Sequence, residues 1–252
     1  MKLRLLASAA VLLSLAACGG GGGGGDSSQP VAAPSITVEA LQGFWNGPVA
    51  GTSFGGASTV RSVVLSDGST WVFMHDGQDN LIGLSTAKLS VSGTNFSGSG
   101  MRYPASGSRA EHISVSGVGP QNGAWSVSVA TGGGTSSLAL TYDNRYQTAA
   151  TPADAIGRWR FTKQGSTIQV TWDISGSGAL TGSSTLGCSY SGQVVPHLSV
   201  NIYDVTVTEN CTNTVKELRG IGRINTAKTF MTFGLTTTDG DQAEAFAAQK
   251  GG

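Results

Sequence analysis

Charged side chains are scarce in this sequence. Asp, Glu, Lys and Arg together make up 12% of the 252 residues, and they cancel to a net charge of zero. That share is about half of what is usual in globular proteins. Without a basic surplus, the chain lacks the electrostatic footprint of a nucleic-acid-binding protein or of one that charge alone holds on anionic lipid. We therefore expect no nucleic-acid partner.

Residues that commonly carry catalysis or bind metals are also few. The three histidines, His75, His112 and His197, do not stand at the spacing of a metal site. No Gly-x-Ser-x-Gly sequence leads from a strand into a helix, as in the α/β-hydrolases. Asp-Gly pairs such as Asp76-Gly77 do not continue to the glutamate of a calcium loop, and hairpin turns explain them better. The sequence predicts a non-enzymatic protein without catalytic residues, metal ligands or cofactors.

The N-terminus lacks an apolar run long enough to span a membrane. Residues 1–4 carry two positive charges, and residues 5–15 form an apolar run that falls short of the roughly 18 residues of a spanning helix. This is the pattern of a secretory signal peptide. Leu15-Ala16-Ala17-Cys18 then resembles the lipobox of bacterial lipoproteins.

By that resemblance, the signal peptide (residues 1–17) is removed and Cys18 is acylated with fatty chains such as palmitate. Gly19, rather than Asp, follows the cysteine, and the resemblance then implies the outer membrane of a Gram-negative cell. Residues 18–38 begin with a glycine run, so we predict a flexible tether of about 25 Å r.m.s. span. The anchored domain could face either side of that membrane.

Only two cysteines follow Cys18 in the sequence. With Cys18 lipidated, Cys188 and Cys211 are left as an even pair in an oxidising compartment, which predicts a disulfide. A metal site would need more ligands, and only His197 lies between them.

Strand patterns dominate from about Ser35 onward, and helix patterns are almost missing. Apolar and hydroxyl residues alternate with a period of two, for example from Trp125 to Val129, as in strands with one buried and one wet face. Asp-Gly pairs and glycine clusters separate the strands. We count about eight strand segments in each half of the chain. The prediction is an all-β protein of two tandem antiparallel up-and-down barrels: residues 39–146, a linker at 147–155, and residues 156–252.

The two halves share weak similarity that favours a duplication. Gly43-Phe44-Trp45 opens the first and Gly157-Arg158-Trp159 opens the second, and Val91-Ser92-Gly93 echoes Ile174-Ser175-Gly176. The spacing between these motifs differs, so chance similarity in a Ser/Gly-rich β-protein stays an alternative.

Three further resemblances concern architecture. Gly-x-Trp resembles the opening of lipocalin and avidin-like barrels. Two barrels on a lipidated tether resemble transferrin-binding and factor-H-binding surface lipoproteins. The second half resembles a recurrent domain of uncharacterised proteobacterial lipoproteins. The residues that carry this resemblance are Gly187–Gly192, Asn201-Ile202-Tyr203 and Cys211. None of these implies a site residue.

Binding residues can be suggested only as candidates for a barrel rim or cavity. His75 shares strand parity with Trp71 and Phe73, although an ordinary residue that ends a strand before an Asp-Gly turn explains it better. Arg158, Arg160 and Lys163 indicate the wet face of a strand, which explains them better than a specific anion site does. If a barrel encloses a small ligand, tryptophans should line the cavity. The candidate ligand or rim residues are therefore His75 and four tryptophans: Trp71, Trp45, Trp159 and Trp172.

The leading hypothesis is a lipid-anchored outer-membrane protein that binds a protein partner or a small ligand. One alternative is an inhibitor of an enzyme such as lysozyme, acting through a protruding loop near His75–Asn80 or Ser183–Tyr190. Another is a structural component of the envelope.

Overall fold

The computed structural model describes residues 35–104 and 110–251. The predicted signal peptide, the lipidation site Cys18 and the glycine run lie outside these residues. The described residues belong to one compact unit, Pro34–Gly252. No helix within them is both long enough and apolar enough to cross a membrane.

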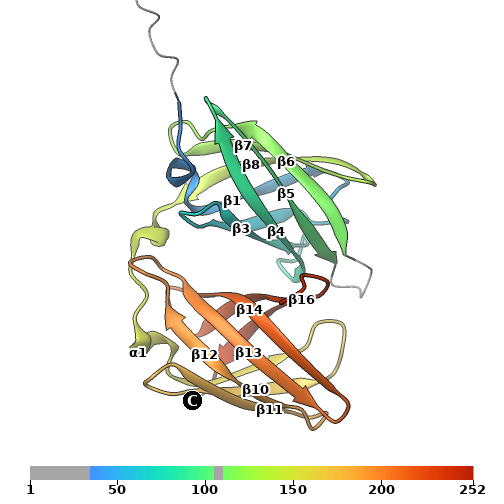
Figure 1. Cartoon of the computed structure of the whole chain (residues 1–252), viewed down its shortest axis with the longest axis vertical. Helices are drawn as coiled ribbons and strands as arrows, with labels where there is room; N and C mark the ends of the chain where they lie inside the picture. Colours follow the sequence, from blue (N-terminus) through green and yellow to red (C-terminus); the bar gives the residue numbers. More distant parts are fainter. Residues whose placement is uncertain (1–34, 105–109, 252) are drawn as a thin grey trace, which may run out of the picture. The chain divides into compact units, whose positions relative to one another are not determined.

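The first half of the chain closes into an antiparallel barrel of eight strands in sequential order, in which β8 returns to pair with β1 (Figure 1). A short 3-10 helix, η1 (Val38–Leu41), precedes it, and another, η2 (Asn144–Gln147), follows it. The strands are β1 (Gly43–Gly51), β2 (Thr59–Val64), β3 (Ser69–His75), β4 (Leu81–Ser92), β5 (Asn95–Pro104), β6 (Glu111–Val118), β7 (Ala124–Thr131) and β8 (Gly134–Asp143).

The second half closes in the same way, and β16 pairs with β9. One helical turn, α1 (Pro152–Ala155), precedes this barrel. The strands are β9 (Gly157–Thr162), β10 (Gln169–Ile174), β11 (Ala179–Ser184), β12 (Ser189–Pro196), β13 (Tyr203–Cys211), β14 (Thr214–Ile224), β15 (Phe230–Thr237) and β16 (Ala243–Lys250). The predicted fold, two tandem eight-stranded barrels, is confirmed.

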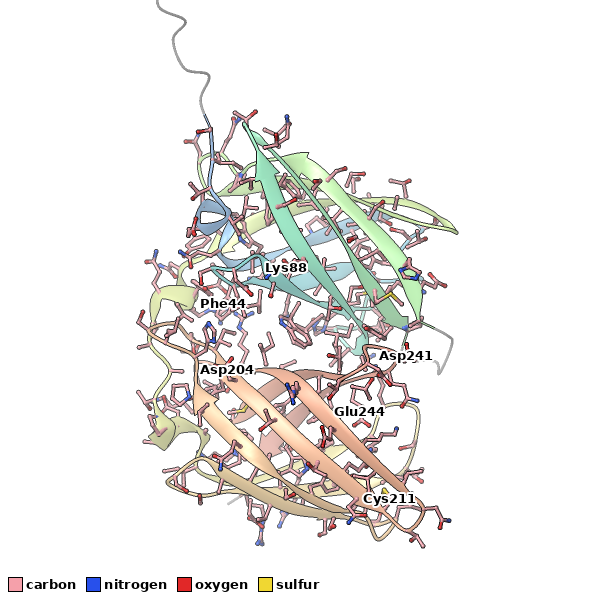
Figure 2. The ribbon with its side chains drawn as sticks, in the orientation of Figure 1. Phe44, Lys88, Asp204, Cys211, Asp241 and Glu244 are labelled. Atoms are coloured by element: carbon pink, nitrogen blue, oxygen red, sulfur yellow. A yellow bond between two sulfur atoms is a disulfide. The ribbon has the colours of Figure 1, made fainter. Side chains whose placement is uncertain are left out.

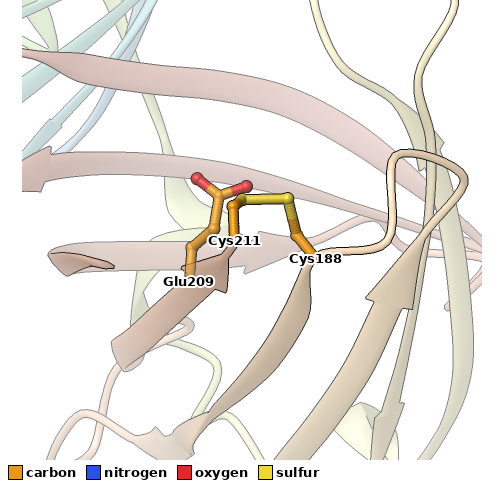
Figure 3. A group of neighbouring side chains, drawn as sticks. All are labelled: Cys188, Glu209 and Cys211. Atoms are coloured by element: carbon orange, nitrogen blue, oxygen red, sulfur yellow. A yellow bond between two sulfur atoms is a disulfide. The ribbon is translucent and has the colours of Figure 1, made fainter. Parts of the chain in front are cut away.

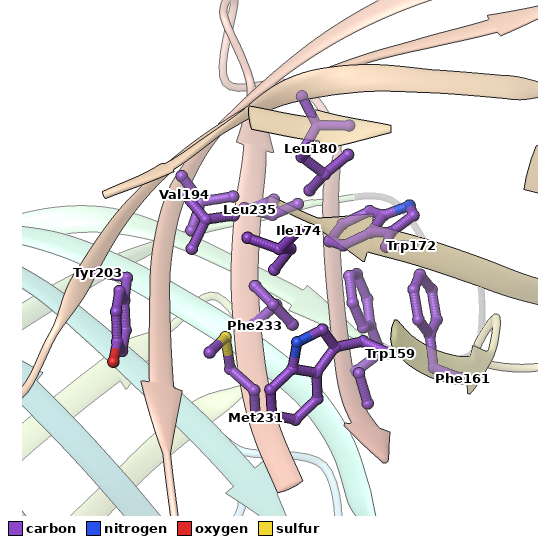
Figure 4. Close-up of a cluster of buried hydrophobic side chains, with 14 of the residues drawn as sticks. Trp159, Phe161, Trp172, Ile174, Leu180, Val194, Tyr203, Met231, Phe233 and Leu235 are labelled. Atoms are coloured by element: carbon purple, nitrogen blue, oxygen red, sulfur yellow. The ribbon is translucent and has the colours of Figure 1, made fainter. Parts of the chain in front are cut away.

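Alternation along the strands decides which side chains fill the barrels. In β7, Trp125, Val127 and Val129 are buried while the serines between them are exposed. Because successive side chains point to opposite faces, the apolar set turns inward and the hydroxyl set outward. In the second barrel, Phe161 and Phe246 stack with ring centroids 3.7 Å apart (Figure 4 shows Phe161 within this core).

The two barrels begin with the same local structure, which supports duplication. Trp45 Nε1 donates to the carbonyl oxygen of Leu41 at 2.9 Å, and Trp159 Nε1 donates to that of Ala155 at 2.8 Å. In both cases the acceptor ends the helical turn that precedes the barrel. The glycine two residues before each tryptophan has a positive φ, 150° at Gly43 and 125° at Gly157.

The Ser-Gly echo, by contrast, does not align. Ser92-Gly93 lies at the turn between the fourth and fifth strands of its barrel, whereas Ser175-Gly176 lies between the second and third. The recurring Ser-Gly pair therefore reflects the preference of hairpin turns for these residues. The feature that the two barrels share is the Gly-x-Trp sequence at the start of the first strand.

Cys188 and Cys211 form the predicted disulfide. Cys188 immediately precedes β12 and Cys211 ends β13, and these two strands are hydrogen-bonded neighbours. The bond therefore staples one end of a hairpin in the second barrel.

Candidate functional site

The outer faces of the barrels meet in an apolar cluster of their own. Phe73 and Leu84 of the first barrel pack with Ile221 and Ala245 of the second. Phe44 on β1, which Figure 2 labels, belongs to the same cluster. Small-molecule sites are often found where such units meet.

A cleft beside the apolar cluster is lined by three arginines. Its volume is ≈ 290 Å³. Arg61 on β2 and Arg145 on η2 come from the first barrel and its following turn, and Arg223 comes from β14 of the second. The remaining lining residues are Asn201, Ile224, Asn225 and Thr232.

Asp143 holds two of these arginines in place. Arg145 donates to its carboxylate from Nε at 2.9 Å, and Arg223 donates from Nη2 at 3.0 Å. Asn46 adds a bond from Nδ2 at 3.1 Å. Chiefly because Arg145 donates hydrogen bonds to it, the pKa of Asp143 lies well below its usual range. This carboxylate therefore stays ionised and fixes the two guanidinium groups at the cleft.

Arg223 is the most constrained of the three. Its guanidinium carbon lies 3.8 Å from the centre of the Phe44 ring, a cation–π geometry, and its side chain is 13% exposed. Burial lowers the pKa of Arg223 to about 10; the charges of Arg145 and Arg61 add to this shift, and Asp143 opposes it. Asp143 is the only hydrogen-bond acceptor of the Arg223 side chain among the described residues. The group is still charged at neutral pH, with N–H donors left for a ligand.

Arg61 lies at the outer side of the cleft, beside the predicted rim residue His75. Arg61 donates to both carboxylate oxygens of Asp79 at 2.7 Å. His75 Nδ1 lies 3.2 Å from the carbonyl oxygen of Asp79. Burial lowers the pKa of His75, so its ring is neutral at pH 7. Its buried Nε2 has no hydrogen-bond partner in the described part of the chain. His75 borders the arginine group but does not line the cleft.

The charges at this cleft do not cancel. Three guanidinium groups face Asp143 and, more peripherally, Asp79, which leaves a surplus positive charge at a partly desolvated place. Guanidinium groups bind carboxylates and phosphates through paired N–H donors. An anion in this cleft would relieve the repulsion among the arginines. The arrangement therefore suits recognition of an acidic group.

A second polar group closes one end of the second barrel. Lys163 Nζ lies 2.5 Å from Glu209 Oε1 and 3.1 Å from Glu244 Oε1, and Tyr190 donates to Glu209 at 2.6 Å. Burial alone would raise the pKa of Glu209, but the bonds from Lys163 and Tyr190 outweigh it and the pKa is lowered. The expectation that Lys163 lies on a wet strand face was wrong, because its side chain is 19% exposed and pairs with two acids inside the barrel.

The disulfide lies against this network. Figure 3 shows the Glu209 carboxylate beside the bond between Cys188 and Cys211. A carboxylate oxygen of Glu209 and the two cysteine sulfur atoms lie within 4.8 Å of one another. Because the two sulfurs are bonded to each other, they cannot act as thiolate ligands of a metal.

The tryptophans suggested for a ligand cavity occupy two kinds of place. Trp45, Trp159 and Trp172 are at most 3% exposed, and each contacts other side chains of its barrel core. Trp71 is half-buried on the outer face, where it lines a shallow groove of ≈ 340 Å³ with Thr86 and other residues. None of the four lines the arginine cleft.

The arginines of the cleft were missed because the sequence does not show which outer faces meet. The signal for the junction was nevertheless present. Two strands contain runs of consecutive apolar residues, Val72-Phe73-Met74 and Val63-Val64. Every residue of both runs is buried. A strand without alternation is covered on both faces. Arg61 lies two residues from such a run, whereas Arg145 and Arg223 carry no local signal.

No protein-family model matches the chain, and no curated protein matches it. Among solved structures, a protein of unknown function of the DUF3598 family from Nostoc punctiforme is similar over 86% of this chain and 100% of that chain. The identity is 9% and the TM-score is 0.27, which is too low to support an argument. The site therefore rests on the geometry of the chain itself.

Proposed function

We propose that this chain is a lipid-anchored protein of the outer membrane whose barrels form a non-enzymatic binding module for an acidic ligand. The observation that carries the binding proposal is the arginine cleft, where Arg61, Arg145 and Arg223 converge with a surplus positive charge. The lipobox at Cys18 and the glycine run support the anchor. An acidic group on a protein partner would satisfy the same cleft.

Anion binding is tested by titrating the chain from residue 19 onward with inorganic phosphate in low-salt buffer. We expect Arg223→Gln and Arg61→Gln to weaken binding, and added salt to weaken it further because salt screens charges. Arg61 is 46% exposed, so its replacement should not disturb folding. The matched control is Arg158→Gln, an exposed arginine paired with Asp173 on β10. Equal affinity in all variants would contradict the site.

The anchor is tested on the full chain in a Gram-negative host. Globomycin, which blocks the lipoprotein signal peptidase, should leave an uncleaved precursor, and Cys18→Ser should prevent incorporation of labelled palmitate. Normal processing under the drug would refute lipidation and leave the anion site untouched.

Enzyme inhibition remains a second candidate because of one hairpin tip. Leu186 is 66% exposed between β11 and β12, two residues from the disulfide at Cys188. The turn is held by Ser184 N to Cys188 O and by Gly187 N to Ser184 O, both at 3.0 Å. A rigid apolar tip of this kind can enter a concave site. Inhibition of lysozyme that is lost in Leu186→Ser would favour this function.

A further inference from the structure

The arginine cleft contains uncharged polar groups in addition to its guanidinium groups. The amide of Asn201 and the hydroxyl of Thr232 line it, and both residues are half-buried. No side-chain hydrogen bond of either is found among residues 35–104 and 110–251. Asn225 differs, because its side chain bonds to Thr229 and to the backbone of Phe230 within its own turn. Asn201 and Thr232 are therefore the neutral groups available to a ligand.

Thr232 has a fixed relationship to the most buried arginine. Thr232 on β15 is the direct register partner of Arg223 on β14. Directly opposed residues of neighbouring antiparallel strands have Cβ atoms about 4.5–5.5 Å apart and project on the same face. An acid group bound to Arg223 therefore places its adjoining carbon within reach of the Thr232 hydroxyl. A hydroxyl group on that carbon would find a partner there.

The cleft also limits the size of a ligand. Its volume of ≈ 290 Å³ lies just below the usual range for small-molecule sites, which begins at about 300 Å³. One sugar ring fits such a volume and offers hydroxyls to the amide of Asn201 and the hydroxyl of Thr232.

We propose that the arginine cleft binds a hydroxylated organic acid about the size of one sugar ring, as in a uronic acid. This inference rests on the proposed anion-binding function. The acid group binds Arg223 and Arg145, a neighbouring hydroxyl binds Thr232, and a more distant hydroxyl binds Asn201. A free sugar acid and the acidic residue of a polysaccharide share this chemistry.

The test compares sodium glucuronate, sodium acetate, inorganic phosphate and glucose by calorimetric titration of the chain from residue 19 onward. We expect glucuronate to bind about tenfold more tightly than acetate, since two added hydrogen bonds of ordinary strength supply that factor. Glucose should not bind detectably. A glucuronate oligosaccharide that binds more tightly than the monosaccharide indicates a polysaccharide as the source, and equal binding per residue indicates a free acid.

Variants distinguish the proposed ligand class from the proposed anion-binding function on which it rests. Thr232→Val and Asn201→Ala should each lower the ratio of glucuronate to acetate affinity severalfold, whereas Arg223→Gln should weaken every acid. Thr206→Val, on an exposed position of β13, is the matched control. Unfolding curves show whether each variant is folded. If Thr232→Val does not fold, the affinity ratio of Asn201→Ala tests the proposal instead. Acetate and phosphate binding without a preference for glucuronate would overturn the ligand class alone. No binding of any acid would overturn both.

Discussion

Gly234 of the second barrel lies directly against Phe73 of the first. A Cβ atom at Gly234 would be 2.9 Å from the Phe73 ring and 3.1 Å from Leu84 Cδ1. The absence of a side chain on this residue of β15 therefore lets the two outer faces approach each other. The apolar cluster that forms there fixes Arg61 and Arg223 on opposite sides of one cleft.

Gly234→Ala should consequently destabilise the protein by about 1–3 kcal/mol, because an added methyl group overpacks a filled site. Chemical denaturation measures the change. The matched control is Gly176→Ala in the turn after β10, where a Cβ would have its nearest contact at 3.9 Å. Equal unfolding midpoints for the two variants would show that the barrels do not pack as described.

The paired tryptophans allow a second prediction. Trp45→Phe and Trp159→Phe each remove an indole N–H from a backbone carbonyl, at Leu41 and Ala155, within a buried environment. Each should lower the free energy of unfolding by about 1–3 kcal/mol, and by similar amounts, since a buried acceptor is left without its donor. Trp71→Phe, on the half-exposed outer face, should change it much less. Strongly unequal losses at the paired positions would count against equivalent roles.

The fold was predictable because its local signals agree. The alternating segment from Trp125 to Val129 and the Asp67-Gly68 turn, where Gly68 has φ 84°, specify strands and hairpins without help from distant residues. The candidate site was not predictable, because it depends on which outer faces pack together. Arg145 and Arg223 are 78 positions apart (223 − 145) and meet only through Asp143 and the junction.

Reduction of the disulfide should destabilise the protein without opening the second barrel. Cys188 and Cys211 are 23 residues apart, and a crosslink over such a loop contributes about 3 kcal/mol in the loop-entropy model. Denaturation with and without reductant, repeated on the double variant Cys188→Ala and Cys211→Ala, measures this loss. A thiol assay on the unfolded chain from residue 19 onward should find reactive thiols only after reduction. Reactive thiols before reduction would contradict the pair.

Lys163 is the shared charge partner of two acids inside the second barrel, Glu209 and Glu244. Lys163→Met removes the charge but keeps most of the side-chain volume, so Glu209 and Glu244 lose their partner in a desolvated place. Breaking a buried ion pair in this way costs about 3–5 kcal/mol. Lys88→Met is the matched control, since Lys88 and Asp67 form a pair that is 60% exposed on both sides and should contribute less than about 1 kcal/mol.

The effect of pH distinguishes lost charge pairing from a packing defect. In the native protein the pKa of Glu209 is lowered, so its stabilising contribution is present above the unfolded pKa and is lost as the pH falls through the folded one. In Lys163→Met, only the Tyr190 hydrogen bond and the charge of Lys216 oppose burial, which is the largest influence on Glu209, so the pKa of Glu209 should rise above its ordinary value. The folded variant then binds a proton more readily than the unfolded chain, and its stability increases as the pH falls from 7 towards 5. Urea denaturation across that range should show the two proteins converging in acid. Parallel curves would mean that Lys163 stabilises the barrel by packing alone.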